Sequence, residues 1–247
     1  MSLRTLILIP VYNHERGLAT MLDGLRASGL PCLLVDDGSE PGCAGALAEM
    51  ARAHADWLTL VTRAANGGKG AALMTGFAEA ARRGYTHVLQ IDADGQHDTA
   101  DIPRFLAAAQ ANPEALILGQ PRYDQSVPTG RLIGRYVTHV WVWINTLSLD
   151  IADTMCGFRV YPLPPVQSVL AQEKLGSRMD FDTEIVVRLH WRGVRVVNLP
   201  TPVRYPADGV SHFKLWLDNV MISRMHARLF FGMVWRAPRL LWRRIAG

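Results

Sequence analysis

The stretch Val88-Leu89-Gln90-Ile91-Asp92-Ala93-Asp94-Gly95-Gln96-His97-Asp98 decides the fold of this chain. Its first four residues form a short, largely apolar run, which is typical of a buried strand in a parallel sheet. Two carboxylates, those of Asp92 and Asp94, follow where the strand is expected to end. Ligands of open α/β sheets bind just beyond the carboxyl ends of the strands. The stretch therefore predicts a strand that delivers two carboxylates to a binding edge.

The side chains of Asp92, Asp94 and Gln96 offer the oxygen ligands that Mg²⁺ and Mn²⁺ prefer, with a diphosphate completing the coordination. Asp and Gly are equally common at helix N-caps and in polar turns. On this stretch alone, a metal site and a polar turn are equally good interpretations.

Two earlier apolar runs also end in polar residues. Leu33-Leu34-Val35 leads into Asp36-Asp37-Gly38-Ser39, and Leu6-Ile7-Leu8-Ile9 leads into Pro10-Val11-Tyr12-Asn13. Helical patterns separate the three runs, which is the alternation expected of βαβ units. Three strands are thus predicted to bring polar side chains to one edge of a sheet. A ligand that carries a base, a ribose and a metal-bound diphosphate requires such an edge.

The remaining periodicity predicts the other elements. Strands are expected over Thr5–Ile9, Cys32–Asp36, Leu58–Val61, His87–Ile91 and Leu116–Leu118, and extended segments over Arg159–Tyr161 and Val194–Tyr205. Helices are expected over Glu15–Arg26, Ala44–His54, Gly70–Arg82, Ile102–Gln110, Leu132–Leu149, Gln167–Gln172 and Glu184–Trp191. Pro162-Leu163-Pro164-Pro165 is interpreted as a local turn.

Composition fits one large α/β domain. The chain has 247 residues, of which 49% are hydrophobic and 19% charged, so it is globular rather than disordered. Its three cysteines form no CxxC pair, which favours a reducing compartment. The apolar run Leu6–Val11 is too short for a signal peptide, and no run is long enough to span a membrane. We expect a cytoplasmic protein, peripheral on the inner membrane face.

The basic character is concentrated in the tail, residues 213–247, which follow a predicted domain of residues 1–212. The tail holds seven Lys and Arg residues against one acidic residue, whereas the whole chain has a net charge of +4. It also holds three Trp and three Phe residues. Basic residues mixed with large aromatics favour an amphipathic helical element on an anionic membrane surface over a helix packed on the domain. Pro238 is expected to divide it into two short helices. Nucleic acid is not expected as a partner, because no recognition motif accompanies the charge.

Five motifs in order resemble those of family-two glycosyltransferases, inverting enzymes of the GT-A fold that use nucleotide-sugars. They are Ile9-Pro10-Val11-Tyr12-Asn13, Val35-Asp36-Asp37-Gly38-Ser39, Asn66-Gly67-Gly68-Lys69-Gly70, Asp92-Ala93-Asp94-Gly95-Gln96-His97 and Cys156-Gly157-Phe158-Arg159. The branch that transfers sugars to polyprenyl or dolichol phosphate is the most similar, although it usually has Ser where Cys156 stands. The resemblance implies a Rossmann-like α/β fold with a mixed, mostly parallel sheet flanked by helices.

The resemblance also implies roles at the donor site. Asp92, Asp94 and Gln96 would hold Mg²⁺ or Mn²⁺ on the diphosphate of a UDP- or GDP-sugar. The donor itself would contact Pro10, Tyr12, Asp36, Asp37, Asn66 and Lys69. Loss of the Asp37 carboxylate is therefore expected to weaken nucleotide binding without affecting stability. Residues 66–70 are not a Walker A loop, because Gly70 stands where that motif has Ser or Thr.

Two acceptor classes remain open. A lipid-linked phosphate is already an anion and needs cations, for which Arg122 and Arg135 are the leading candidates, with Arg131 and Arg159 as further ones. A hydroxyl of a glycolipid or polyene-type lipid needs a carboxylate base, for which Asp182 and Glu184 are candidates, with Asp153 and Asp180 as further ones. Helix capping explains Asp182 and Glu184 equally well.

Two other classes of function are weighed against transfer. A nucleotidyltransferase usually carries a Gly-rich basic loop after its first strand, but this chain has Pro10-Val11-Tyr12-Asn13 there. A membrane-bound scaffold that only binds nucleotide-sugars would not need Asp92, Asp94 and Gln96. Both features favour an enzyme, a metal-dependent glycosyltransferase with a lipid-linked acceptor.

Overall fold

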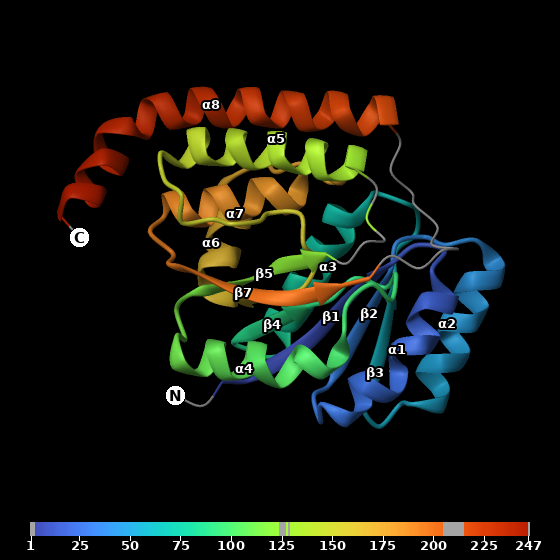
Figure 1. Ribbon diagram of the computed structural model, residues 1–247. Helices are drawn as coiled ribbons and strands as arrows, with labels where there is room; N and C mark the ends of the chain where they lie inside the picture. Colours follow the sequence, from blue (N-terminus) through green and yellow to red (C-terminus); the bar gives the residue numbers. More distant parts are fainter. Residues whose placement is uncertain (1–2, 124–126, 128, 205–214, 247) are drawn as a thin grey trace.

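The computed structural model describes residues 3–123, 127, 129–204 and 215–246. Within them a single seven-stranded sheet lies between layers of helices (Figure 1), in the strand order β3-β2-β1-β4-β6-β5-β7. The strands are β1 (Thr5–Val11), β2 (Cys32–Asp36), β3 (Leu58–Thr62), β4 (His87–Gln90), β5 (Leu116–Tyr123), β6 (Arg159–Pro162) and β7 (Val196–Val203). Strand β6 is antiparallel to both its neighbours, and the other pairs are parallel. The expected mixed, mostly parallel α/β sheet is confirmed.

Eight helices accompany the sheet in the described residues. They are α1 (Glu15–Ala27), α2 (Pro41–Ala53), α3 (Lys69–Arg82), α4 (Ile102–Ala111), α5 (Thr129–Thr146), α6 (Leu163–Gln172), α7 (Phe181–Trp191) and α8 (Leu215–Ala246), with a short 3-10 turn at Thr99–Asp101 before α4.

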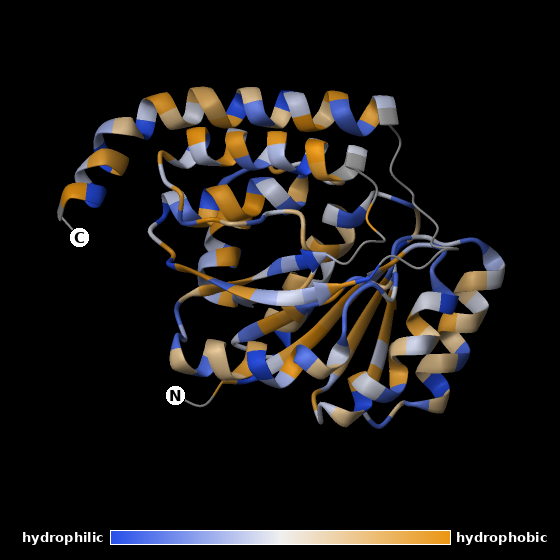
Figure 2. Cartoon of the chain, viewed as in Figure 1, coloured by the Kyte–Doolittle hydropathy of each residue, from blue (hydrophilic) through white to orange (hydrophobic). Residues whose placement is uncertain are grey.

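The pleat of β1 divides the core into two. Leu6 and Leu8 point to the face covered by α3, α6 and α7, whereas Ile7 and Ile9 point to the face covered by α1, α2 and α4. All four side chains are buried, since a central parallel strand is covered on both sides. Figure 2 shows the strands as largely apolar ribbons between helices of mixed character.

The parallel register brings the binding edge together. Val11 at the end of β1 lies opposite Asp36 at the end of β2, and Leu8 of β1 lies opposite Gln90 at the end of β4. The turns that follow these three strands therefore meet at one edge of the sheet, as the sequence predicts.

Helix α8 is part of the folded domain rather than a separate tail. Its Met225, Leu229, Met233 and Leu240 are buried in the same core as α7 and the sheet. It lies along α5, and the two helices form an outer layer over α7 (Figure 1). The sequence favoured a membrane element over a packed helix, but the described part of the tail packs on the domain. Phe213 and Lys214 of the tail lie outside the described residues.

Prolines account for the main errors in the predicted elements. Pro164 and Pro165 stand in the first turn of α6, where a missing N–H costs nothing, so the predicted turn is wrong. Pro41 opens α2 three residues before its predicted start in the same way. Pro238 lies inside α8, so the prediction of two short helices is also wrong. It is exposed, which leaves water free to satisfy the carbonyl that has lost its donor, and Figure 1 shows the helix bending toward its C-terminal end.

Two other ends differ for other reasons. Strand β5 continues to Tyr123, five residues beyond its predicted end, because β7 pairs with it over its whole length. Helix α5 ends at Thr146 because Leu147 adopts a left-handed backbone with φ of 51°. Tyr205, the predicted end of the segment that forms β7, lies outside the described residues.

Candidate active site

The loop after β4 places two carboxylates at the binding edge. Asp92 accepts from Lys69 Nζ at 2.7 Å and from Gln90 Nε2 at 3.3 Å. Asp94 Oδ1 accepts the Gln96 amide at 3.0 Å, which closes the turn. Burial, and then the nearby charge of Asp92, raise the pKa of Asp94. The loop thus gathers negative charge in a partly buried position, which a cation would relieve.

Two glycines let neighbouring segments approach this loop. A Cβ on Gly157 would overlap the Asp92 carboxylate, and a Cβ on Gly17 would overlap the Ala93 carbonyl. Only a residue without a side chain allows backbone to approach so closely. The Cys-Gly-Phe-Arg motif therefore acts as a wall of the site through its glycine.

Lys69 joins two distant parts of the chain at this loop. Its Nζ lies 2.7 Å from Asp92 Oδ2 and 2.7 Å from Asp182 Oδ2, in the first turn of α7. Burial opposes the charge of Lys69, but Asp182 and Asp92 outweigh this effect and raise its pKa. For Asp92, burial is likewise outweighed by the Lys69 charge, and its pKa is lowered. The Lys69 ammonium is therefore fixed between two carboxylates.

The turn after β2 gives its two carboxylates different surroundings. Both oxygens of Asp37 are occupied, by Arg63 Nε at 2.8 Å and by the amides of Gly67 and Gly68. Asp36 Oδ1 accepts the Ser39 amide at 2.9 Å, but Asp36 Oδ2 is buried without a partner in the described residues. Asp37 therefore anchors the loop at Gly67 and Gly68, whereas Asp36 Oδ2 can still accept a hydrogen bond from a ligand.

The other predicted donor contacts surround these turns. Pro10 and Tyr12 are half-buried at the end of β1, beside Asn13, which has a left-handed φ of 53°. The Asn13 amide donates to the Ser39 hydroxyl, and the Asn13 side-chain oxygen accepts the Glu40 amide. Asn66 is exposed just before the two glycines that Asp37 holds. All six predicted donor residues thus lie at the ends of β1 and β2, in the turns that follow them, or between β3 and the first residue of α3.

His97, in the same loop, has an environment that sequence reasoning did not resolve. Its side chain is buried against Phe158, with ring centroids 5.6 Å apart, and its Nδ1 has no partner in the described residues. Burial lowers the pKa of His97 even though Asp92 and Asp94 act to raise it. The ring belongs to the wall of the site.

The predicted cations have unequal freedom. Arg122 is exposed on β5 and forms no ion pair within the described part of the chain. Arg135 of α5 holds Asp153 with Nε at 2.5 Å and Nη2 at 2.8 Å, and its guanidinium carbon lies 5.5 Å from the Tyr123 ring centroid. The Arg131 side chain lies outside the described residues.

Asp153, a further candidate for the base, is the centre of a buried cluster. It also receives His139 Nε2 at 3.0 Å and the amides of Met155 and Cys156. Burial disfavours its charge, but His139 and Arg135 prevail and lower its pKa. The pairing with His139, one helical turn from Arg135, is a contact that the sequence pattern did not indicate.

Arg159 and Glu184 are occupied in the interior. The fully buried Arg159 donates to the carbonyls of Thr154, Cys156 and Asp182 and to the Tyr161 hydroxyl. Glu184, also fully buried, accepts from Arg188, Arg228 and the Gly176 amide. These contacts engage both side chains in the interior, and of the two α7 candidates Asp182 is the one that contacts Lys69.

No three Asp, Glu, His or Cys side chains form a metal-binding group in the described residues. Two carboxylates, Asp92 and Asp94, lie together with Gln96 beside them. This donor set is the size that Mg²⁺ uses when phosphate and water supply the rest of its shell. The residues present therefore fit a cation that the protein and a diphosphate hold jointly.

Known proteins agree with this geometry. The chain is 29% identical over 223 residues to polyprenol monophosphomannose synthase of Mycolicibacterium smegmatis, covering 84% of this chain and 80% of the relative. It is 27% identical over 208 residues to undecaprenyl-phosphate mannosyltransferase of Micrococcus luteus, covering 80% of this chain and 82% of the relative. The fold is similar to that of glucosyl-3-phosphoglycerate synthase from Mycobacterium tuberculosis, solved with Mn²⁺ and UDP-glucose, with a TM-score of 0.66 and 16% identity over 95% of this chain and 79% of that one.

The family model described as glycosyl transferase family 2 matches residues 6–163, which include four of the motifs that line the site and the whole of the Cys-Gly-Phe-Arg wall. The chain therefore belongs to glycosyl transferase family 2 and is a glycosyltransferase.

Proposed function

We propose that the protein transfers a sugar from a UDP- or GDP-sugar to a lipid-linked phosphate, with inversion at the anomeric carbon. The observation that carries the donor part is the pair Asp92 and Asp94 at the carboxyl edge, with Lys69 fixing Asp92 in place. The lipid phosphate acceptor is supported by the two relatives, whose names describe transfer of mannose to polyprenol or undecaprenyl phosphate.

In this reaction the acceptor oxygen forms a bond to the anomeric carbon while the bond to the donor diphosphate breaks. A Mg²⁺ or Mn²⁺ ion bound by Asp94, Asp92 and Gln96 would neutralise the charge that grows on the leaving diphosphate. Lys69 keeps the Asp92 carboxylate oriented, since its ammonium is anchored from the other side by Asp182. A phosphate acceptor is ionised already, so this chemistry needs no base.

The free acceptor atom on Asp36 supports a role in nucleotide recognition. We expect Asp36→Asn to weaken nucleoside diphosphate binding about 10- to 100-fold, because an amide N–H then meets the donor of the base or ribose. The amide can still receive Ser39 through its oxygen, so stability should change little. Isothermal titration calorimetry with UDP and GDP, beside thermal unfolding, measures both effects.

The matched variant is Asp37→Asn. From sequence alone, loss of the Asp37 carboxylate is expected to leave stability unchanged. Its carboxylate holds Arg63 and two amides, so we now expect a loss of about 2–4 kcal/mol in the free energy of unfolding. Unchanged nucleotide affinity in Asp36→Asn would move recognition of the base to other residues.

Arg122 tests the class of acceptor. We expect Arg122→Gln to raise the KM for a polyprenyl phosphate about tenfold or more while the donor KM stays the same, because an exposed guanidinium suits phosphate. Arg135→Gln is a poorer test, since it would also remove one of the two basic neighbours of the buried Asp153. Steady-state kinetics with Arg52→Gln, an exposed arginine on α2, as control provides the measurement.

A hydroxyl acceptor is the alternative, and Asp182 is its candidate base. It predicts that Arg122→Gln leaves the acceptor KM unchanged and that Asp182→Asn abolishes transfer while hydrolysis of the donor continues. Asp182 is already paired with Lys69 and lies 3.4 Å from Arg159 Nη1, so both its neighbours are cations. These two ion pairs already engage the Asp182 carboxylate, which favours the phosphate acceptor.

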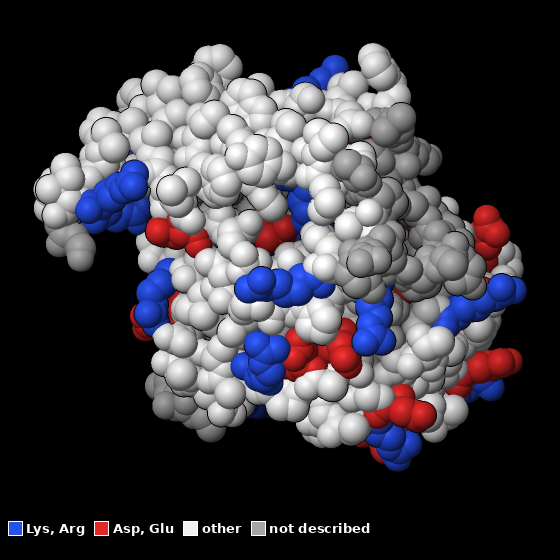
Figure 3. Space-filling model, in the orientation of Figure 1, with Lys and Arg blue, Asp and Glu red and all other residues white. Residues whose placement is uncertain are grey.

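The outer layer supports attachment to a membrane that carries the acceptor. None of the described helices is both long and apolar enough to cross a bilayer. The outward side of α8 nevertheless exposes Trp216, Phe231, Trp235, Trp242 and Ile245, each by more than 65%. Helix α5 adds Ile133, Tyr136 and Val137. We name these eight residues the apolar face. Figure 2 shows hydrophobic residues recurring along both helices among hydrophilic ones, and Figure 3 shows few Lys, Arg, Asp or Glu side chains over them in this view.

The charges of the tail contribute less than the sequence suggests. Arg228 pairs with Glu184, Arg243 donates to the His190 carbonyl and Arg244 to the Leu147 carbonyl. These three cations are therefore engaged with the domain, and the contact with anionic lipid rests mainly on the apolar face.

We expect the doubly substituted Trp235→Glu/Trp242→Glu protein to lose at least about 90% of its flotation with vesicles of phosphatidylcholine and phosphatidylglycerol, because each exposed tryptophan that enters lipid contributes about 1.5–3 kcal/mol. The control is Ala107→Glu/Gln110→Glu on α4, which adds the same charge away from α8. Deleting the tail would be a poor test, since it uncovers the core. Equal flotation of the two variants would contradict the attachment through α8.

A further inference from the structure

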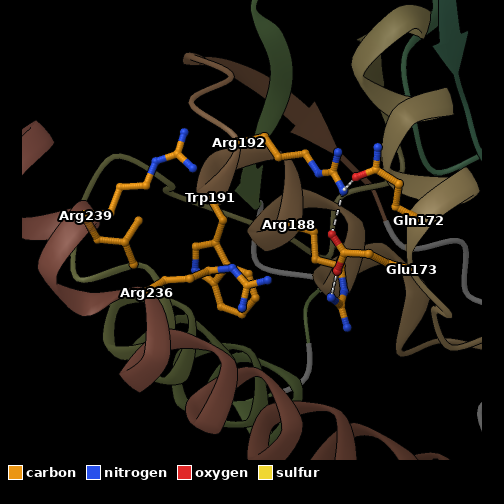
Figure 4. Close-up of a pocket in the computed structure, with 8 residues that line it drawn as sticks. Gln172, Glu173, Arg188, Trp191, Arg192, Arg236 and Arg239 are labelled. Atoms are coloured by element: carbon orange, nitrogen blue, oxygen red, sulfur yellow. Dashed lines mark hydrogen bonds and ion pairs between the residues drawn. The ribbon is translucent and has the colours of Figure 1, made fainter.

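A polar cavity lies at the C-terminal end of α7, away from the N-terminal end that carries Asp182. It has a volume of about 290 Å³, is partly open to solvent and is bordered by α6, α7 and α8 (Figure 4). Trp191, at the C-terminal end of α7, lines it, whereas Asp182 at the N-terminal end faces Lys69. Nine residues of α-helix separate these two side chains, which is about 13 Å along the axis. The cavity is therefore separate from the donor site.

Its lining carries more positive than negative charge. Four arginines, Arg188, Arg192, Arg236 and Arg239, face it together with one carboxylate, Glu173. Glu173 is shared, since it pairs with Arg192 at 2.8 Å and also with Arg188. Arg188 has a second partner in Glu184, at 2.6 Å. The carboxylates near the cavity are thus already committed to Arg188, Arg192 and Arg228.

Arg236 and Arg239 have no such partner. Neither forms an ion pair with a carboxylate in the described residues, and Figure 4 shows both without a dashed line. Arg236 lies over the Trp191 ring, with 4.7 Å from its guanidinium carbon to the ring centroid, and donates to the Gly232 carbonyl. The stacking holds this guanidinium in one orientation, which lowers the entropy that binding a ligand would cost.

The arginines that line the cavity lower the pKa values of neighbouring arginines. Burial and the charges of Arg228, Arg236 and Arg192 lower the pKa of Arg188 to about 10. Burial and the charge of Arg239 also lower the pKa of Arg243, on the next turn of α8. An anion bound by Arg236 and Arg239 would offset the repulsion that Arg236 exerts on Arg188 and Arg239 on Arg243.

We propose that this cavity binds a phosphate-bearing anion, a phosphomonoester or phosphodiester, between Arg236 and Arg239. Guanidinium groups match phosphate oxygens in pairs, and the volume admits a phosphate with a small organic substituent. Trp191 and Leu240 supply apolar contact for the carbons of that substituent. Arg239 is exposed and shares α8 with the apolar face, so the phosphate has two sources, a soluble compound or a lipid headgroup.

The test is titration calorimetry with inorganic phosphate on the full chain. We expect Arg236→Gln/Arg239→Gln to bind phosphate at least tenfold more weakly than the wild type. The matched control, Arg26→Gln/Arg52→Gln, removes two exposed charges from α1 and α2 and should bind as the wild type does. Arg239→Gln alone, at an exposed position, should weaken binding too and covers the case in which the double variant does not fold.

Flotation distinguishes the sources. Weaker binding of the double variant to phosphatidylglycerol-containing vesicles, with no change on pure phosphatidylcholine, identifies a lipid headgroup. Lost phosphate binding with unchanged flotation identifies a soluble phosphate compound. Two results overturn the proposal. One is equal phosphate affinity in the wild type, Arg236→Gln/Arg239→Gln and Arg239→Gln, and the other is no phosphate binding by the wild type.

Discussion

Replacing Asp94 by asparagine is expected to reduce sugar transfer about 10³-fold or more, equivalent to about 4 kcal/mol of transition-state stabilisation. The substitution removes one of the two charges proposed to hold a divalent cation on the leaving diphosphate. It should leave the fold intact, because Asp94 has no ion pair in the described residues and asparagine can still accept the Gln96 amide. Turnover with Mg²⁺ or Mn²⁺, measured beside thermal unfolding, gives both numbers.

Asp98→Asn is the matched control for Asp94→Asn. It lies four residues further along the same loop, is exposed, and caps the Thr99–Asp101 turn through an oxygen that asparagine retains. It should transfer sugar at the wild-type rate. Wild-type turnover in excess EDTA would disprove the proposed role of the cation, whatever Asp94→Asn does.

The largest expected effect on stability is that of Glu184→Gln, about 3–5 kcal/mol in the free energy of unfolding. Glu184 is fully buried, and it neutralises Arg188 at 2.6 Å and Arg228 at 2.6 Å while accepting the Gly176 amide. An amide cannot balance two guanidinium groups, one of which is itself buried. Chemical denaturation with urea, followed by far-UV circular dichroism, measures the loss.

Glu79→Gln is the control for Glu184→Gln, because Glu79 also pairs with two arginines, Arg82 and Arg83, but is only half-buried and has the exposed Arg82 as one partner. Exposed pairs contribute only about 0–1 kcal/mol, so this variant should unfold almost as the wild type does. A loss of transfer in Glu184→Gln without a loss of stability would instead return Glu184 to the list of candidate bases.

The sequence was sufficient to predict which turns meet at one edge of the sheet. Apolar runs that end in Asp36, Asp37, Asp92 and Asp94 specify buried parallel strands, and parallel strands present their carboxyl ends at one edge. This logic needs only local pattern and chain direction, which explains why the strand order of β1, β2 and β4 did not have to be known.

The sequence could not predict which carboxylate oxygens of the site accept a hydrogen bond, because these contacts join residues that are distant in the chain. Lys69 and Asp182 meet across the whole domain, and Arg63 reaches Asp37 from the end of β3. The inward turn of Arg228 and the burial of Glu184 likewise depend on α8 packing against α7. The sequence of α8 places large apolar residues on more than one side of the helix. The pattern alone therefore does not show which side is buried, and tertiary packing decides it.

Lys69 joins Asp92 to Asp182 of α7, so the candidate active site is completed late during synthesis of the chain. Lys69 and the loop after β4 leave the ribosome before the Gly157 wall and before the α7 carboxylate that anchors the ammonium. Until α7 emerges, Lys69 has Asp92 but not Asp182 as an ion-pair partner. At that stage β5 also lacks β7, the strand that pairs with it over its full length. A nascent chain stopped before α7 would therefore carry all the donor motifs and yet have an unfinished site, so that completion of the catalytic centre coincides with completion of the sheet.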